Sequence, residues 1–168
     1  MSTKYVLDPA DRRRLMATPA GWLATGFGSG LVPKAQGTAG SLAAIVPWLL
    51  LHTVLDLWGW LLLIAVSFAL GVRACNVAGR IIGVDDHRSL VWDEFVGQWI
   101  ALLPVLMVPG FAWVVAGFIL FRLFDVWKPW PIAWFDRRVK GGLGVMLDDV
   151  IAGIFAAIVL HFIQFIVL

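Results

Sequence analysis

Three long stretches of the 168-residue chain carry almost no charge, and they constrain its fold more than any other feature. Residues 41–72 contain one acid and no base, and residues 95–121 and 150–168 contain no charged side chain. Hydrophobic residues make up 61% of the chain and charged residues 14%, whereas typical globular domains have about 45–50% and about 25%. A core of this size cannot hide so much apolar surface from water. We therefore predict an all-α integral membrane protein.

The length of the first stretch indicates that it folds back on itself. As one straight helix, residues 41–72 would extend about 48 Å at about 1.5 Å per residue, far beyond a hydrocarbon core about 30 Å thick. A turn near residues 56–59 makes this stretch a hairpin whose second arm continues toward residue 79.

The second stretch contains its own turn signal. Pro109 and Gly110 form a dipeptide typical of turns, which predicts hairpin arms near 92–108 and 111–126. Residues 150–168 form a last apolar helix. The predicted fold is therefore about five short transmembrane helices, arranged as two hairpins plus a C-terminal helix, in a single membrane-embedded domain over residues 1–168.

The basic residues predict how this domain sits in the membrane. All 13 Lys and Arg residues fall in residues 1–40, 73–94 and 122–149, and two hairpins return these three stretches to one side. The positive-inside rule makes that side cytoplasmic and the C-terminus external. Residues 1–20 are polar and lack the apolar region of a signal peptide, so they form a cytoplasmic N-terminal segment. We expect a multi-pass protein of a bacterial inner membrane with charged cytoplasmic loops.

Composition excludes several other classes of protein. The hydrophobicity is too high for a disordered chain, and a lone cysteine, Cys75, cannot form an intramolecular disulfide. The net charge of +2 arises from basic residues in loops between apolar runs, an arrangement that suits an anionic membrane face better than nucleic acid. We therefore expect no nucleic-acid partner, and the sequence leaves the oligomeric state open.

Five acids are the candidate chemical groups. Asp93-Glu94 and Asp148-Asp149 each precede a predicted helix, where the helix dipole and free N–H groups alone would favour acids. Asp125 lies inside an apolar, aromatic run, where a carboxylate is costly and needs a partner. Arg122 and Lys128, three residues to either side, are neighbours on a helix, so a structural ion pair is the alternative interpretation of Asp125.

Together these acids predict a metal-assisted site for a phosphate. Carboxylate oxygens suit Mg²⁺, and cations such as Lys34, Arg122, Lys128 and Arg138 suit phosphate. The glycine-rich segments 28–30 and 37–41, the latter with Thr38, would offer N–H groups at the start of the first membrane helix. No P-loop, cysteine-phosphatase, histidine-phosphatase or Asp-x-Asp motif is present. An ion or small-molecule transporter that uses the same acids is the alternative, although their clustering at one face argues against it.

Several long blocks of this sequence resemble the phosphatidylglycerophosphatase A family. They occur in the family's order and cover roughly residues 20–160, namely 26–33, 37–42, 91–97, 121–131, 134–137 and 141–149. The resemblance implies a Mg²⁺-dependent enzyme of the inner membrane that removes the terminal phosphate of phosphatidylglycerophosphate and yields phosphatidylglycerol.

The same resemblance implies roles for individual residues. The matching blocks contain Asp93, Glu94, Asp125, Asp148 and Asp149, which become the predicted catalytic residues and Mg²⁺ ligands. The predicted phosphate-binding residues are Lys34, Thr38, Arg122, Lys128 and Arg137, with Lys34 lying between blocks. Asp136 is either a further ligand or an ion-pair partner of Arg137 or Arg138. The number of metal ions, the base, and the choice between water attack and an aspartyl-phosphate intermediate stay open.

Overall fold

The computed structural model describes residues 7–167, and this part of the chain contains helices and no strand. The prediction of an all-α fold is confirmed. The predicted segment 1–20 contains the first helix, and its residues 1–6 lie outside the described part. The elements in chain order are α1 (Pro9–Met16), α2 (Pro19–Ala24), η1 (Ser29–Leu31), α3 (Gln36–Leu51), α4 (Leu57–Ile82), α5 (Trp92–Leu102), η2 (Leu103–Leu106), α6 (Phe111–Trp127), α7 (Ile132–Arg138) and α8 (Gly141–Val167).

The first predicted hairpin is formed by α3 and α4. The chain turns over residues 52–56, and the carboxylate of Asp56 caps α4 by accepting a 2.8 Å hydrogen bond from the N–H of Gly59. This cap explains why a single acid interrupts an otherwise apolar stretch. α3 starts at Gln36, so the glycine-rich segment 37–41 forms its first turns, at the helix start as predicted from the sequence.

The second predicted hairpin is formed by α5 and α6. Pro104 lacks an N–H group and ends the α-helical hydrogen bonding, so α5 gives way to the 3-10 segment η2. The turn follows at residues 107–110, with Gly110 preceding α6. The turn signal was therefore interpreted correctly, although the first arm is a shorter α-helix than predicted.

The last helix differs most from its prediction. It begins at Gly141, nine residues before the expected start, and Gly141 itself has a left-handed φ of 69°. The side-chain oxygen of Asn76 on α4 accepts a 2.7 Å hydrogen bond from the N–H of Gly142 and so anchors the start of α8. Asp148 and Asp149 consequently lie two turns inside a helix. The expectation that this acid pair precedes the helix is therefore wrong. Free N–H groups at a helix end do not stabilise these two acids, so their position needs another explanation.

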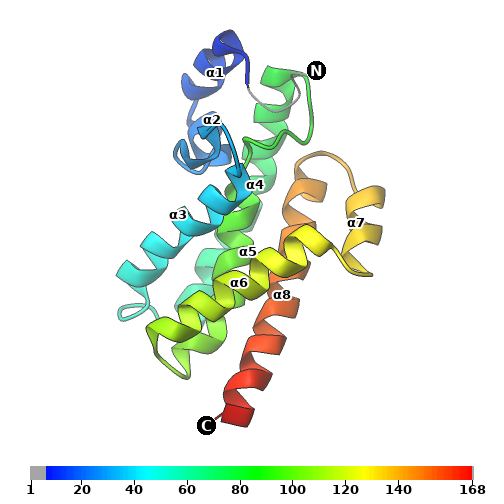
Figure 1. Cartoon of the computed structure of the whole chain (residues 1–168). Coiled ribbons are helices and arrows are strands. Elements are labelled where there is room, and N and C mark those ends of the chain that lie inside the picture. The colour runs from blue at the N-terminus through cyan, green and yellow to red at the C-terminus, as the bar shows by residue number, and fades with distance from the viewer. Residues whose placement is uncertain (1–6, 168) are drawn as a thin grey trace.

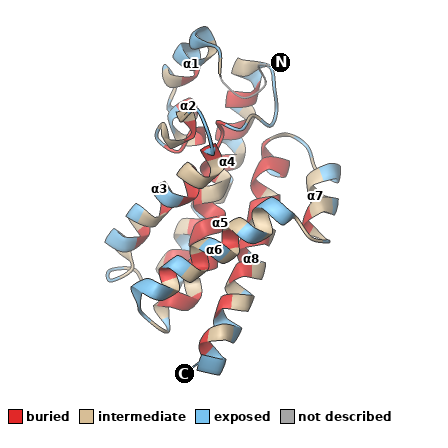
Figure 2. Cartoon of the chain, in the orientation of Figure 1, coloured by how far each residue is buried: buried red, intermediate tan, exposed pale blue. Residues whose placement is uncertain are grey.

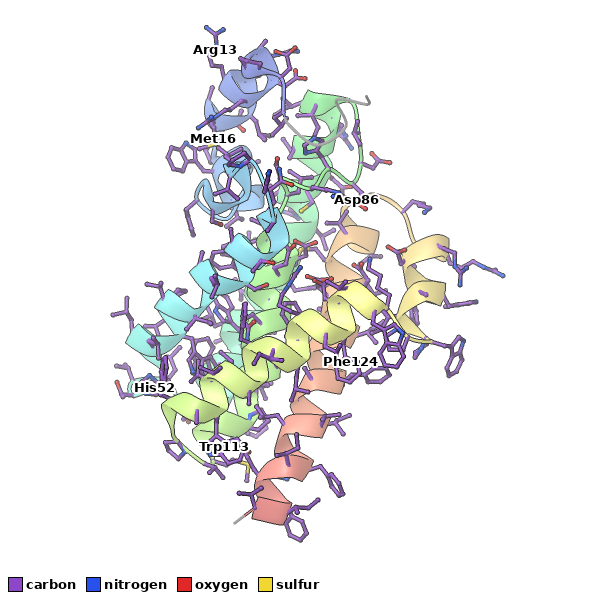
Figure 3. All side chains as sticks on the ribbon, viewed as in Figure 1. Arg13, Met16, His52, Asp86, Trp113 and Phe124 are labelled. Carbon is purple, nitrogen blue, oxygen red and sulfur yellow. The ribbon has the colours of Figure 1, made fainter. Side chains whose placement is uncertain are left out.

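The helices alternate in direction along the long axis of the molecule (Figure 1). Both hairpin turns and the C-terminus lie at one end, whereas α1, α2, α7 and the start of α8 lie toward the other. Figure 3 shows His52 and Trp113 near the hairpin turns and Arg13 and Asp86 at the opposite end. The three charged stretches therefore gather toward one end, as the two-hairpin arrangement predicts.

Two helices are long and apolar enough to cross a membrane. They are α4 with 26 residues and α8 with 27, about 40 Å each at about 1.5 Å per residue. α3, α5 and α6 have 16, 11 and 17 residues, which is short of the roughly 20 needed for a crossing. Membrane insertion is thus supported for two of the five predicted crossings, and the other three stay a prediction.

Tryptophans form the core between α3, α4 and α5. Trp48 and Trp60 are fully buried, with ring centroids 4.2 Å apart. The indole N–H of Trp99 on α5 donates to the carbonyl of Ala44 on α3, and that of Trp92 donates to Ser67 on α4. These two bonds satisfy buried polar groups and tie α5 to both arms of the first hairpin.

Glycines allow α5 and α8 to touch along their backbones. A side chain at Gly153 of α8 would place its Cβ 2.5 Å from the carbonyl oxygen of Gly97 on α5. A Cβ at Gly97 would lie 2.7 Å from the carbonyl oxygen of Asp149. Small residues let apolar helices approach in this way. Burial is accordingly concentrated on α5 and on the facing side of α8 (Figure 2).

We predict that Gly153→Val destabilises the protein, because its side chain meets the backbone of α5, which cannot move aside. Overpacking of this kind typically costs roughly 1–3 kcal/mol. The midpoint of thermal unfolding in detergent, followed by helical circular dichroism, should fall by several degrees. Ala112→Val at an exposed position of α6 is the control and should change the midpoint little. Equal midpoints for the two variants would contradict this account of the α5–α8 contact.

Candidate active site

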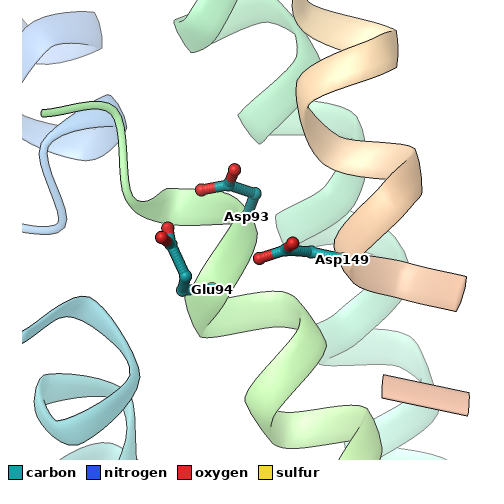
Figure 4. A group of neighbouring side chains, drawn as sticks. All are labelled: Asp93, Glu94 and Asp149. Carbon is teal, nitrogen blue, oxygen red and sulfur yellow. The ribbon is translucent and has the colours of Figure 1, made fainter. Parts of the chain in front are cut away.

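Three carboxylates meet where α5 begins beside α8. Asp93 and Glu94 lie in the first turn of α5, and Asp149 lies on α8. One oxygen from each lies within 4.8 Å of the other two. Figure 4 shows the three side chains gathered around a common space beside the first turn of α5, which Asp149 reaches from α8. All three were predicted metal ligands, and the fold brings them together from positions more than 50 residues apart.

The α5–α8 contact explains why these side chains converge. Gly97 is one turn after Asp93 on α5, and it lies against the backbone of Asp149. The contact therefore fixes Asp149 beside the first turn of α5. Asp149 also interacts electrostatically with Asp125 and Asp148, so all five predicted acids belong to one group.

These acids line a cavity of about 520 Å³. The first turn of α3, the loop between α4 and α5, the end of α6, and α7 complete its wall. Among the predicted residues that line it are the five acids, Arg122 and Lys128. This is the end of the molecule at which the charged stretches gather.

Several carboxylate oxygens in this cavity are buried without a hydrogen-bond partner in the described part of the chain. They are Asp93 Oδ1, Glu94 Oε2, Asp148 Oδ1 and Asp149 Oδ2. Buried carboxylates are strongly unfavourable unless a cation or hydrogen bonds compensate for lost hydration. Clustered oxygens of this kind are the ligands that hard divalent cations such as Mg²⁺ prefer. The donor set therefore fits a Mg²⁺ ion.

Arg122 connects α6 to this acidic group. Its guanidinium forms a short ion pair with Asp125 and lies 4.0 Å from Glu94 and 3.5 Å from the hydroxyl of Ser41 on α3. Gly37 makes room for this network, since a Cβ there would be 2.3 Å from Glu94 Oε1 and 3.0 Å from the guanidinium. The ion pair between Arg122 and Asp125 expected from helix spacing is thus present, and it lies in the cavity wall.

Lys128 has different partners from those its spacing suggests. It ends α6 in a left-handed conformation just before Pro129, and its ammonium lies 2.9 Å from Asp136 and 2.5 Å from Asp148. Burial lowers the pKa of Lys128, but the charges and hydrogen bonds of Asp148 and Asp136 outweigh burial and raise it above its ordinary value. Lys128 is therefore a permanent cation that holds one oxygen of Asp148.

Three predicted phosphate-binding residues lie outside the cavity wall. Lys34 and Arg137 are exposed, and the Nε of Arg137 donates to the carbonyl of Ala133 at 2.9 Å. Thr38 is half-buried in the first turn of α3, next to Gly37, but does not line the cavity. Their assignment to phosphate remains a prediction.

Other residues of the wall were not predicted from the sequence. Asp85, Asp86 and Arg88 line it from the loop between α4 and α5, and Lys140 lines it from the segment before α8. The partner of Asp136 was also not identified, since it pairs with Lys128 and not with an adjacent arginine. The high charge of the loop between α4 and α5 was the available signal for its residues. It was not specific, because charged loops usually lie on the solvated surface.

Comparison with known proteins identifies the family of this chain. The family model of phosphatidylglycerophosphatase A matches residues 22–164. Phosphatidylglycerophosphatase A of Escherichia coli is 49% identical, with 93% of this chain and 90% of the relative covered. The protein of the same name from Haemophilus influenzae is 43% identical, covering 89% and 91%. A protein of Bacteroides thetaiotaomicron, named provisionally as a phosphatidylinositol-3-phosphatase, is 41% identical over 82% of this chain and 89% of its own length. No solved structure matches the chain.

The family match spans every element from α3 to most of α8, and so includes all five acids of the cavity. The two relatives of the same name are similar over nearly their whole lengths. The chain therefore belongs to the phosphatidylglycerophosphatase A family and is a phosphatase.

Proposed function

We propose that this phosphatase hydrolyses the terminal phosphate of phosphatidylglycerophosphate in a Mg²⁺-dependent reaction that yields phosphatidylglycerol and inorganic phosphate. The observation that carries the proposal is the group of buried, unpartnered carboxylate oxygens of Asp93, Glu94 and Asp149, which lie beside Arg122 in one cavity. The names of two relatives support the substrate.

In this proposal Asp93, Glu94 and Asp149 hold the metal ion. Bound Mg²⁺ would neutralise charge on the phosphate and lower the pKa of water. Of the five predicted acids, Asp125 and Asp148 lie in the same cavity but outside the three-carboxylate group, so we assign to one of them the proton released by the attacking water. Lys128 keeps Asp148 in place through one oxygen, and the other oxygen has no hydrogen-bond partner among residues 7–167.

Arg122 is the residue we assign to the phosphate. A guanidinium has five N–H donors, and the ion pair with Asp125 leaves some of them for a ligand. In a buried cavity those donors would stabilise the charge that develops on the phosphoryl oxygens. Gly37 keeps the first turn of α3 close enough to complete this wall.

The proposed placement is a multi-pass protein of a bacterial inner membrane with the cavity facing the cytoplasm. It is supported by the apolar lengths of α4 and α8 and by the basic residues near the cavity. The alternative of an ion or small-molecule transporter is not favoured, because the cavity acids lie at one end of the molecule and not along its length.

The relative from Bacteroides favours a second substrate to test. Its name indicates another lipid phosphate monoester, a phosphatidylinositol 3-phosphate. Both compounds present a dianionic phosphate on a glycerolipid headgroup, and the cavity carboxylates would treat that phosphate alike. The substrates differ in the group that leaves, so comparison of their kcat/KM values identifies the preferred lipid.

We predict that the metal and Asp149 are both essential. Purified protein in detergent should release phosphate from phosphatidylglycerophosphate with Mg²⁺ and lose that activity with chelator. Asp149→Asn removes one ligand charge and should lower kcat by roughly 100-fold or more, an effect typical of lost transition-state stabilisation. Asp56→Asn at the far turn retains the helix cap and should keep normal activity. Mg²⁺-independent release would contradict the proposed chemistry.

Arg122→Lys provides a second test. The substitution keeps the positive charge but removes the planar guanidinium, whose N–H donors contact several groups at once. We expect kcat/KM to fall by about 10- to 100-fold, corresponding to roughly 1.4–2.7 kcal/mol of transition-state binding. Arg73→Lys, on an exposed position of α4, is the matched control. Unchanged kinetics in Arg122→Lys would remove Arg122 from the phosphate site.

The membrane placement predicts where reporters will be found. A reporter fused after residue 168 should be periplasmic, and one inserted in the loop at residues 83–88 should be cytoplasmic. Two hairpins return the chain to its starting side, so the last helix must end on the opposite side. Finding both reporters on one side would contradict the five-crossing arrangement.

A further inference from the structure

Exposed tryptophans surround the end of α6 and the short helix α7. We call residues 126–140 the α6–α7 corner. Within it Trp127, Trp130 and Trp134 are 68%, 81% and 43% exposed. Hydrocarbon explains apolar exposure along the long helices, but this corner lies at the end of the molecule where charged residues gather. Its exposed indoles therefore require a different environment.

The α6–α7 corner is also strongly basic. It contains four Lys and Arg residues and one acid. The acid, Asp136, is paired with Lys128, whereas Arg137 and Arg138 are exposed. The guanidinium of Arg138 lies 5.5 Å from the ring centroid of Trp134, so one small surface combines an aromatic face with cations.

The same corner forms part of the cavity. Val126, Lys128, Asp136, Val139 and Lys140 line the cavity wall, and the exposed tryptophans lie between these residues in sequence. Figure 2 shows exposed residues on α7 and at the adjoining end of α6. The corner therefore connects the cavity directly with an aromatic, basic outer surface.

Tryptophan and arginine together are typical of the headgroup layer of a membrane. Indole rings prefer the interface because they have an apolar body and a polar N–H. The positive charge of arginine is stabilised there by the negative potential of anionic lipids. A protein partner would need acidic residues opposite the arginines and an apolar pocket for the indole rings. An anionic leaflet offers negative headgroups beside an apolar interior over its whole surface.

We propose that the α6–α7 corner is seated in the headgroup layer of an anionic phospholipid leaflet and holds the cavity at the depth of lipid phosphates. The part that concerns substrate access rests on the proposed function. On this view the lipid substrate reaches the cavity along the leaflet surface, and its acyl chains stay in the bilayer while the phosphate meets the carboxylates.

Spin-label depth measurements test the seating without using activity. Cys75 is buried, so a thiol-directed nitroxide will label an introduced cysteine in the full-length protein. Trp130→Cys is the test position, Val84→Cys in the loop after α4 is the hydrated reference, and Ile158→Cys on the outward side of α8 is the hydrocarbon reference. The unmutated protein reports any background labelling at Cys75.

In vesicles of phosphatidylglycerol and phosphatidylcholine, we expect the label at position 130 to lie between the two references in its accessibility to oxygen and to a water-soluble nickel complex. Adding Arg137→Gln and Arg138→Gln should move it toward the hydrated reference. Accessibility at position 130 equal to that at position 84 would overturn the proposal. An unchanged depth in the arginine variant would show that anionic lipid does not hold the corner.

Kinetics test the consequence for substrate access. Trp130→Ala combined with Trp134→Ala should raise KM several-fold for phosphatidylglycerophosphate in vesicles and leave kcat unchanged. Hydrolysis of a water-soluble, short-chain analogue should not change. Trp58→Ala, at a 76% exposed position near the far turn, is the control. An equal loss on both substrates would overturn the access role, whereas absence of activity in the unmutated protein would refute the proposed function and leave the depth result valid.

Discussion

The backbone contact between α5 and α8 is the constraint on which the rest of the site depends. With Gly97 and Gly153 facing each other, the two helices approach closely enough for Asp149 to lie beside Asp93 and Glu94. A methyl group added at Gly153 would collide with the backbone of α5, and one added at Gly97 would collide with the backbone of α8 and with the ring of Phe121. The favourable packing of two apolar helices thus offsets the unfavourable free energy of bringing the acids together.

Repulsion among the acids opposes that packing. Buried like charges are unfavourable, and two cations of the wall compensate part of this charge: Arg122 pairs with Asp125 and lies 4.0 Å from Glu94, and Lys128 pairs with Asp136 and Asp148. Beside the α5–α8 contact, Asp93 Oδ1, Glu94 Oε2 and Asp149 Oδ2 have no hydrogen-bond partner in the described part of the chain. The unpartnered carboxylate oxygens are therefore concentrated in one part of the cavity. Their type and number fit a divalent cation.

The sequence predicts the parts of this structure that depend on local signals. Pro109 and Gly110 marked a real turn, a 32-residue apolar stretch had to fold back, and five acids in family blocks identified the cavity. Helix spacing also anticipated the ion pair between Arg122 and Asp125. The turn, the hairpin and the ion pair follow from turn chemistry, from length and from neighbours a few residues away.

Features created by contacts between distant segments were not predictable in this way. Residues 141–149 are helical because Asn76 of α4 and the backbone of α5 support them, although their glycines and acids suggested a loop. Lys128 takes partners from α7 and α8 because a left-handed residue ends α6 there. A single sequence contains no signal for such contacts until the helices are packed together.

The imbalance of charge in the cavity has a kinetic consequence. A phosphate monoester is itself a dianion, and an enzyme without its metal would offer it clustered carboxyl oxygens with no bound cation between them. On the proposed function, we therefore expect the cation to bind before the lipid. On that proposal, the arrangement of carboxylates on α5 and α8 predicts an order of addition, in which the metal concentration sets the fraction of enzyme that is competent to bind substrate.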